Sequence, residues 1–211
     1  MHATRIITTC AWNPGKSRDY ACYASPTHSA IDFFISQSRE SLYITDQSVE
    51  KTLQRPYSYD ALRKLLAERS GEASTVIGLW NAKYGTSQCI VHLIVGTGPL
   101  ICSLTVTIKG SIEHLFAMKA YMLYAAEQFD AVRARVIGGD VIDLLVKEDR
   151  KTKGGELAYL RRSEIVEVEG FTAQRHGDGV LYVMDRNLAE SGVEARAAAI
   201  LRLQPLYDSL A

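Results

Sequence analysis

Apolar and polar residues alternate along several short segments of the chain, and this pattern predicts β-strands. Thr4–Trp12 is rich enough in β-branched and apolar residues for a first strand, and Asn13-Pro14-Gly15 ends it with a strong turn signal. Further strands are expected at Ser74–Trp80 and at residues 89–95, and Gly96-Thr97-Gly98-Pro99 then forms a hairpin loop. These segments predict a sheet of short strands joined by turns.

The strand that follows this hairpin loop separates its two faces most clearly. One face carries apolar side chains, and the other carries hydroxyl side chains. The apolar residues are Leu100, Cys102, Leu104, Val106 and Ile108, and the hydroxyl residues are Ser103, Thr105 and Thr107. One buried face and one wet face are typical of an antiparallel sheet rather than a parallel one.

Helical spacing of apolar residues predicts four helices elsewhere in the chain. The helix after Ser111 is the longest of them, and Glu113 lies in its first turn, where the helix dipole favours an acid. Its apolar residues recur at helical spacing, so this helix can cover the apolar face of the sheet. The other helices are expected around residues 31–35 with Thr27 or Ser29 as the N-cap, after the N-cap Ser58, and at about residues 192–203.

The C-terminal part of the chain adds four short strands to this picture. They are expected at residues 132–137, Leu157–Leu160, residues 164–168 and Gly179–Met184. Arg133 and Arg135 project the same way from the first of them, and residues 147–155 form a charged loop. We therefore predict a single α+β domain over residues 1–211, with a mainly antiparallel sheet packed by a long central helix and flanking helices.

Composition and charge narrow the classes of function. The chain has 211 residues, of which 47% are hydrophobic and 23% are charged, and this ordinary globular composition excludes disordered and disulfide-scaffold classes. Its 24 Lys and Arg residues balance its 24 Asp and Glu residues, so the formal net charge is zero. Proteins that bind phosphate backbones normally carry a basic surplus. We therefore expect no direct nucleic-acid partner.

The longest apolar stretches are far shorter than the ~20 residues that a bilayer-spanning helix needs. The N-terminus meets the polar residues Thr8 and Thr9 after only two isoleucines, so it lacks the apolar core of a secretory signal. We expect a cytoplasmic protein with no membrane partner.

The four cysteines are widely spaced, and three of them sit in apolar segments. They are Cys10, Cys22, Cys89 and Cys102. Paired metal-ligand spacing is absent, since the nearest combination is Cys89 with His92. We interpret the cysteines as free and mostly buried thiols, and we predict no metal and no cofactor.

Two glycine-containing turns were tested as nucleotide-binding motifs. Gly15-Lys16-Ser17 has the ending of a phosphate-binding loop, but Cys10 stands where that motif needs its first glycine. Gly96 and Gly98 lack the third glycine of a dinucleotide fingerprint, and Pro99 removes a backbone N–H group that the motif uses. Both segments are therefore interpreted as polar turns.

Catalytic residues are not evident, but one acidic arrangement keeps an enzymatic alternative open. Asp140, Asp143 and Asp149-Arg150-Lys151 resemble the acids and lysine with which metal-dependent nucleases hold magnesium and activate water. The histidines are scattered, and none accompanies a recognisable nucleophile motif. We expect a protein that is not an enzyme, and the alternative is a small metal-dependent hydrolase or nuclease with an unrecognised site.

Large aromatic residues meet turn-forming residues where the strand Ser74–Trp80 ends. Trp80-Asn81 is followed closely by Tyr84 in Lys83-Tyr84-Gly85. Such a tryptophan either packs at the rim of the core or anchors a partner protein, because buried aromatic side chains dominate protein interfaces.

Taken in order, these features resemble the immunity protein 52 family of bacterial polymorphic-toxin and type VI secretion systems. The resemblance rests on elements spread over most of the chain. They are the first strand with Trp12, the aromatic-rich helix at residues 31–35, the strand ending in Leu79-Trp80-Asn81 with the hairpin after it, the Gly-x-x-x-Tyr-Leu element at residues 155–160, the strand at residues 180–184, and the closing helix that ends at residues 206–210.

The resemblance implies an immunity protein that binds and neutralises a cognate secreted toxin, typically a nuclease of the restriction-endonuclease fold. Inhibitors of nucleases often present carboxylates in place of phosphates, and the acidic surplus after residue 111 can do so. It includes Glu156, Glu164, Glu167 and Glu169. The candidate partner-binding residues are therefore Trp80, Asn81, Tyr84, Glu164 and Glu167.

Overall fold

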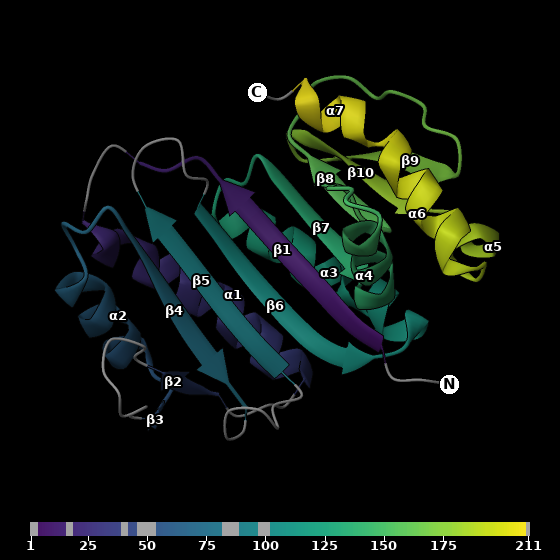
Figure 1. The fold of residues 1–211 in the computed structure, drawn as a ribbon. Helices are drawn as coiled ribbons and strands as arrows, with labels where there is room; N and C mark the ends of the chain where they lie inside the picture. Colours follow the sequence, from purple (N-terminus) through teal and green to yellow (C-terminus); the bar gives the residue numbers. More distant parts are fainter. Residues whose placement is uncertain are drawn as a thin grey trace.

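The computed structural model describes residues 4–15, 19–38, 42–45, 54–81, 89–96 and 102–209. Within these residues, ten strands form one antiparallel sheet with helices on both of its faces (Figure 1). The strands are β1 (Thr4–Trp12), β2 (Tyr43–Thr45), β3 (Gln54–Pro56), β4 (Ser74–Trp80), β5 (Cys89–Gly96), β6 (Cys102–Gly110), β7 (Arg133–Gly138), β8 (Leu157–Leu160), β9 (Phe171–His176) and β10 (Gly179–Met184). The helices are the 3-10 helix η1 (Tyr20–Tyr23), α1 (Ala24–Ser38), α2 (Tyr59–Glu68), α3 (Ile112–Gln128), α4 (Gly139–Lys147), α5 (Arg186–Ala189), α6 (Val193–Arg202) and α7 (Gln204–Asp208).

The N-terminal strand β1 lies in the interior of the sheet. The strand order is β3-β2-β4-β5-β6-β1-β7-β8-β10-β9, so β1 separates β6 from β7 (Figure 1). Thr4 pairs with Gly110 and Trp12 pairs with Cys102 on the β6 side, while Ala11 pairs with Arg133 on the β7 side. The predicted class, an α+β fold with a mainly antiparallel sheet, is confirmed.

One face of the sheet carries the larger core. Alternate residues of the strands, such as Ile6 and Cys10 on β1 and Val136 on β7, point to this face and pack under α1, α2 and α3. The ring of Trp12 stacks on Phe129 with 4.0 Å between the ring centroids, which ties β1 to the end of α3. The helices cover this face because their own apolar residues recur at helical spacing.

A second core forms on the opposite face, at the C-terminal end of the sheet. It contains Ile137 of β7, Leu160 of β8 and Tyr182 of β10, which alternate with residues of the first core. Helices α4, α5, α6 and α7 supply the other side of this core. Strands β8 and β10 are therefore buried on two faces, and β7 is buried on both faces only at its last three residues; Figure 1 shows α3 behind these strands and α4 and α6 in front.

Helix starts follow the capping rules where the sequence offers a good cap. The hydroxyl oxygen of Ser58 accepts the Ala61 N–H at 3.2 Å, and α2 begins at the next residue, as predicted. Ser111 caps α3 in a capping box with His114, and Glu113 lies in the first turn of this helix. These caps satisfy N–H groups that have no partner inside the helix.

Four sequence predictions differ from the structure. Helix α1 begins at Ala24 rather than after Thr27 or Ser29, because Pro26 lies in the first turn, where a missing N–H costs nothing. Residues 164–168 do not form a strand; β9 takes the edge position beside β10 instead. Helix α4 and strand β9 were not predicted, since the glycines and acids around residue 139 and the polar residues of β9 resemble loop sequence.

Gly155, which lies shortly before β8, allows the backbone to lie very close to the backbone of β7. A Cβ atom on this residue would lie 2.3 Å from the carbonyl oxygen of Val136 on β7. We expect Gly155→Ala to lower the free energy of unfolding by about 1–3 kcal/mol, because the backbone must shift to relieve the overlap. Urea denaturation measures the change.

Gly192→Ala provides the matched control for this substitution. There the added Cβ meets only the flexible end of Glu194 at 3.3 Å, so the loss should stay below about 1 kcal/mol. Equal stability losses in the two variants would contradict the packing argument.

Candidate functional site

The face of the sheet opposite α1, α2 and α3 carries exposed side chains on its N-terminal strands. Val76 on β4 and Ile94 on β5 are 46% and 37% exposed. Nearby on this face, the hydroxyl groups of Thr105 and Thr9 lie 3.3 Å apart and connect β6 with β1. This part of the sheet is therefore available for contact with another molecule.

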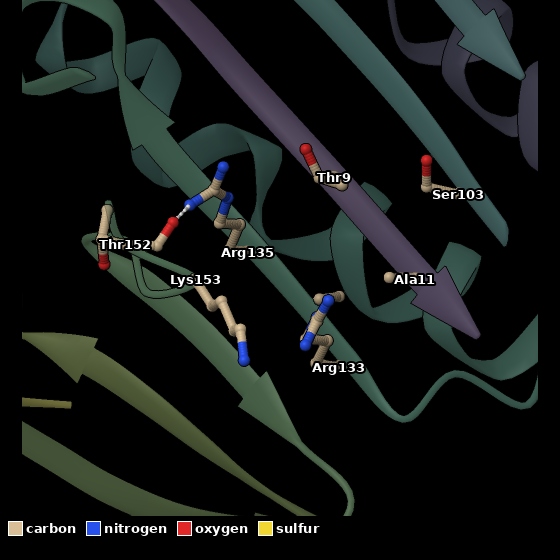
Figure 2. Close-up of a pocket in the computed structure, with 8 residues that line it drawn as sticks. Thr9, Ala11, Ser103, Arg133, Arg135, Thr152 and Lys153 are labelled. Atoms are coloured by element: carbon tan, nitrogen blue, oxygen red, sulfur yellow. Dashed lines mark hydrogen bonds between the residues drawn. The ribbon is translucent and has the colours of Figure 1, made fainter. Parts of the chain in front are cut away.

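A concavity of about 210 Å³ lies on the same face, beside the central strand β1. Figure 2 shows the cationic side chains of Arg133, Arg135 and Lys153 grouped beside β1. The residues that line it are Thr9 and Ala11 of β1, Ser103 of β6, Arg133, Ala134 and Arg135 of β7, and Thr152 and Lys153 of the loop after α4. We call this feature the basic concavity.

Strand register places the two arginines. In the pairing of β1 with β7, Thr9 lies opposite Arg135 and Ala11 lies opposite Arg133. Because side chains alternate along a strand, both arginines project to the same face, as the sequence predicted. The small side chain of Ala11 leaves room above the strand next to Arg133.

Arg135 also fixes the loop that carries Lys153. Its Nη1 atom donates hydrogen bonds to the carbonyl oxygens of Thr152 at 2.7 Å and Gly154 at 3.1 Å. The guanidinium is thereby held in place by backbone oxygens, which neutralise no charge. Burial lowers the pKa of Arg133 and Arg135; for Arg135, Tyr207 and Glu156 oppose this shift, and the neighbouring Arg133 adds to it.

No carboxylate in the described part of the chain forms an ion pair with Arg133 or Arg135. Lys153 lies near one acid, with 3.6 Å between its Nζ atom and Oδ1 of Asp208, and both side chains are substantially exposed. Such an exposed ion pair contributes little to the stability of the protein. The basic concavity therefore keeps a local surplus of positive charge.

A buried ion-pair network lies in the second core and includes Glu156. The Glu156 side chain is fully buried; its carboxylate accepts hydrogen bonds from the Gly138 N–H at 3.1 Å and from Nη1 of Arg196 at 3.2 Å. Arg196 also pairs with Asp140. Burial raises the pKa of Glu156 to about 7, although Arg196 and the Gly138 N–H favour the charged form. The inclusion of Glu156 among carboxylates that could meet a partner was therefore wrong.

The acids considered for magnesium binding are held apart by separate partners. Asp140 pairs with Arg196, and Oδ1 of Asp143 lies 2.6 Å from Nη2 of Arg5. Asp149 occupies the turn after α4 with a φ of 53°. Among the residues that the structure describes, no group of three His, Cys, Asp or Glu side chains is placed to hold a metal ion.

Trp80, predicted as a possible partner anchor, packs closely in the structure. Its side chain is only 6% exposed, and its ring meets His92 edge-on with 5.6 Å between the centroids. The side-chain oxygen of Asn81 accepts a hydrogen bond from the N–H of Cys89, the first residue of β5, at 3.1 Å. Tyr84 lies outside the described residues.

Glu164 and Glu167 lie on an irregular segment between β8 and β9, which we call the acidic segment (residues 163–169). Both glutamates are exposed, and Ile165 and Val166 between them are 45% and 37% exposed. Within the described chain neither glutamate forms an ion pair. Glu169 does form one, with 3.2 Å between its Oε2 atom and Nη1 of Arg202. The segment combines apolar and carboxylate side chains on one exposed stretch.

The backbone of the acidic segment is held by side chains from the sheet. Arg175 of β9 donates to the carbonyl oxygens of Ser163 and of Arg162, the latter at 3.3 Å. The Val166 N–H donates to the hydroxyl oxygen of Tyr182 at 3.4 Å. These contacts order the segment without using its carboxylates.

The thiols are free, as predicted. Cys10, Cys89 and Cys102 are buried, and Cys22 is exposed. Burial raises the pKa of Cys10 well above its usual range, so this thiol stays protonated.

Sequence reasoning missed the basic concavity because its residues come from three strands and a loop. The available signal was the Arg-x-Arg pattern on β7 beside the basic residues of the loop at 147–155. Strand pairing was needed to show that Thr9 and Ser103 lie beside these cations.

Comparison with solved structures shows a shared fold. The chain is similar to the Pseudomonas aeruginosa T6SS protein PA0821, with a TM-score of 0.62 and 9% sequence identity. The match covers 98% of this chain and 73% of that chain. No family model and no curated protein matches the chain. Membership of the immunity protein 52 family therefore stays a prediction.

Membrane insertion through a helix finds no support in the described residues, since none of their helices has the length and apolar character to cross a bilayer.

The pKa of Glu156 makes the stability of the protein depend on pH. Between its ordinary value of 4.5 and about pH 7, the folded protein keeps a proton on Glu156 that the unfolded chain has lost. The contribution of this group to stability therefore falls as pH rises through that window, by a few kcal/mol in total. We expect Glu156→Gln to remove this decline, as measured by urea denaturation at several pH values.

The control is Glu194→Gln, which changes an exposed glutamate in the first turn of α6. Its stability profile should parallel that of the unmodified protein across the same pH range. If the profile of Glu156→Gln also paralleled that of the unmodified protein, this result would contradict the raised pKa of Glu156.

Proposed function

We propose that this protein is an immunity protein that binds a cognate toxin of a type VI secretion system and neutralises it. The acidic segment is the observation that carries the proposal. Its exposed Ile165 and Val166 lie between Glu164 and Glu167, and its backbone is held by Arg175 and Tyr182.

Such a segment suits the active-site cleft of a nuclease. A nuclease binds phosphates with cationic side chains, so carboxylates on an inhibitor are complementary to its cleft. Apolar side chains between the carboxylates add area that is removed from water on binding. Because the segment is already ordered by hydrogen bonds, its association costs less conformational entropy than that of a flexible loop.

The fold supports the biological setting of this proposal. The similar Pseudomonas aeruginosa protein is a T6SS protein by name, and its likeness to this chain covers 98% of the present sequence. The resemblance of the sequence to the immunity protein 52 family points to the same setting. In this proposal the protein acts in the cytoplasm and protects the producing cell during bacterial competition by masking the toxin rather than by catalysis.

The test uses the protein encoded immediately upstream of this gene, because immunity genes follow their toxin genes and the proposal therefore predicts a secreted toxin there. Co-expression of its C-terminal domain with this chain should restore growth, and the two proteins should form a complex in calorimetry. Continued toxicity, or no complex between the purified proteins, would falsify the proposal.

Substitution of the acidic segment tests whether it forms the interface. We expect Glu164→Gln combined with Glu167→Gln to weaken toxin binding at least about tenfold, and Ile165→Ala to weaken it further, because central interface side chains carry most of the affinity. Both variants should retain their free energy of unfolding within about 0.5 kcal/mol, since the changed side chains are exposed.

The matched control replaces two other exposed glutamates, Glu148→Gln with Glu194→Gln, and thus removes the same charge elsewhere. Equal weakening by the control and by the acidic-segment variant would show a general charge effect and reject this interface.

A further inference from the structure

The lining of the basic concavity contains three cationic side chains and no acid, although Lys153 lies near Asp208 outside the lining. Arg133, Arg135 and Lys153 line a space of about 210 Å³, and the lining contains no Asp or Glu. Like charges gathered in a partly buried site repel one another, and burial disfavours the charged form of each. An anion in the concavity relieves both effects.

The geometry prepares this site for an oxyanion. Arg135 is anchored by two backbone carbonyl oxygens, so its position is set before any ligand arrives. Arg133 forms no ion pair within the described chain, which leaves its planar N–H groups available for two parallel hydrogen bonds to oxygen atoms. Thr9 on β1 and Ser103 on β6 add hydroxyl donors to the lining (Figure 2).

A second concavity of about 400 Å³ adjoins the first and shares Arg135, Thr152 and Lys153 with it. Its remaining lining is apolar where Ile142, Leu145 and Val146 of α4 contribute, and polar where Arg150, Lys151 and Gln204 contribute. Val146 is 70% exposed, an unusual position for an aliphatic side chain in a charged region. This second space fits the uncharged part of a small organic ligand.

We propose that the basic concavity binds the phosphate group of a small organic phosphate monoester, with the organic part in the adjoining concavity. A phosphate dianion offers three oxygen atoms and nearly two negative charges, which match the cations of the site better than the single charge of a carboxylate does. This function is separate from toxin binding and concerns the free protein.

Calorimetric titration of the free full-length protein at constant ionic strength tests the proposal. The probes are phenyl phosphate, inorganic phosphate and benzoate. We expect phenyl phosphate to bind more tightly than inorganic phosphate, because the ring enters the adjoining concavity, and both phosphates to bind more tightly than benzoate. Absence of binding by phenyl phosphate, or equal binding by benzoate, overturns the proposal.

Variants locate the site. Arg133→Gln should raise the dissociation constant of phenyl phosphate at least roughly tenfold, because it removes charge-assisted hydrogen bonds. Lys153→Gln is a second variant on a different element and should also weaken binding. Arg63→Gln is the matched control, since this exposed arginine lies on α2, over the other face of the sheet. Unchanged affinity in both site variants, or an equal loss in the control, rejects the site.

The adjoining concavity has its own variant. Val146→Ser should reduce the preference for phenyl phosphate over inorganic phosphate and leave the affinity for inorganic phosphate unchanged. An unchanged preference rejects the placement of the organic group. Because no toxin is present in these titrations, their failure leaves the immunity function untouched, and the reverse also holds.

Discussion

The antiparallel pairing of β1 with strands on both sides is the constraint on which the rest of the structure depends. On one side β1 completes the β4-β5-β6 meander, and on the other it begins the group of β7, β8, β10 and β9. Within the described sheet, β1 is the strand through which the two groups are joined by backbone pairing, and the larger core spans both groups. Its two faces also serve two purposes, because Ile6 and Cys10 enter the larger core while Thr9 lines the basic concavity. A slip of one residue would exchange these faces.

Burial differs sharply between the two halves of the sheet. Strands β8 and β10 lie between helices and are buried on both faces, whereas β5 and β6 alternate between buried and accessible residues. The doubly covered half contains the Glu156 and Arg196 network, in which each buried charge has a partner. On the uncovered face, β1 and β6 present the hydroxyl groups of Thr9 and Ser103, and β7, at the border between the two halves, presents Arg133 and Arg135. The difference in covering therefore decides where the molecule can meet a ligand.

Local sequence was sufficient for elements whose signals are local. Strands β1, β4, β8 and β10 start and end where alternation and turn residues predicted, and helix α2 starts directly after the predicted cap Ser58. Residues 164–168 show the limit of this reasoning: their alternating pattern fits a strand, but the edge of the sheet belongs to β9. The sequence predicted that Arg133 and Arg135 project the same way, but not the rest of the basic concavity, because register decides that Thr9 lies beside Arg135, and register follows from distant pairing. The burial of Glu156 likewise depends on distant packing, because its partner Arg196 lies on helix α6.

A formal net charge of zero conceals two surfaces of opposite sign, and the same physical device produces both. In the basic concavity, Arg135 donates to backbone carbonyl oxygens of the loop and leaves the positive charge unpaired. In the acidic segment, Arg175 donates to backbone carbonyl oxygens and leaves Glu164 and Glu167 without an ion pair in the described chain. Hydrogen bonds from arginine to carbonyl oxygens thus order each surface while its charge stays available. If carboxylates had ordered these segments through ion pairs, the local charge would have been cancelled, and the two surfaces would have little to offer a charged ligand.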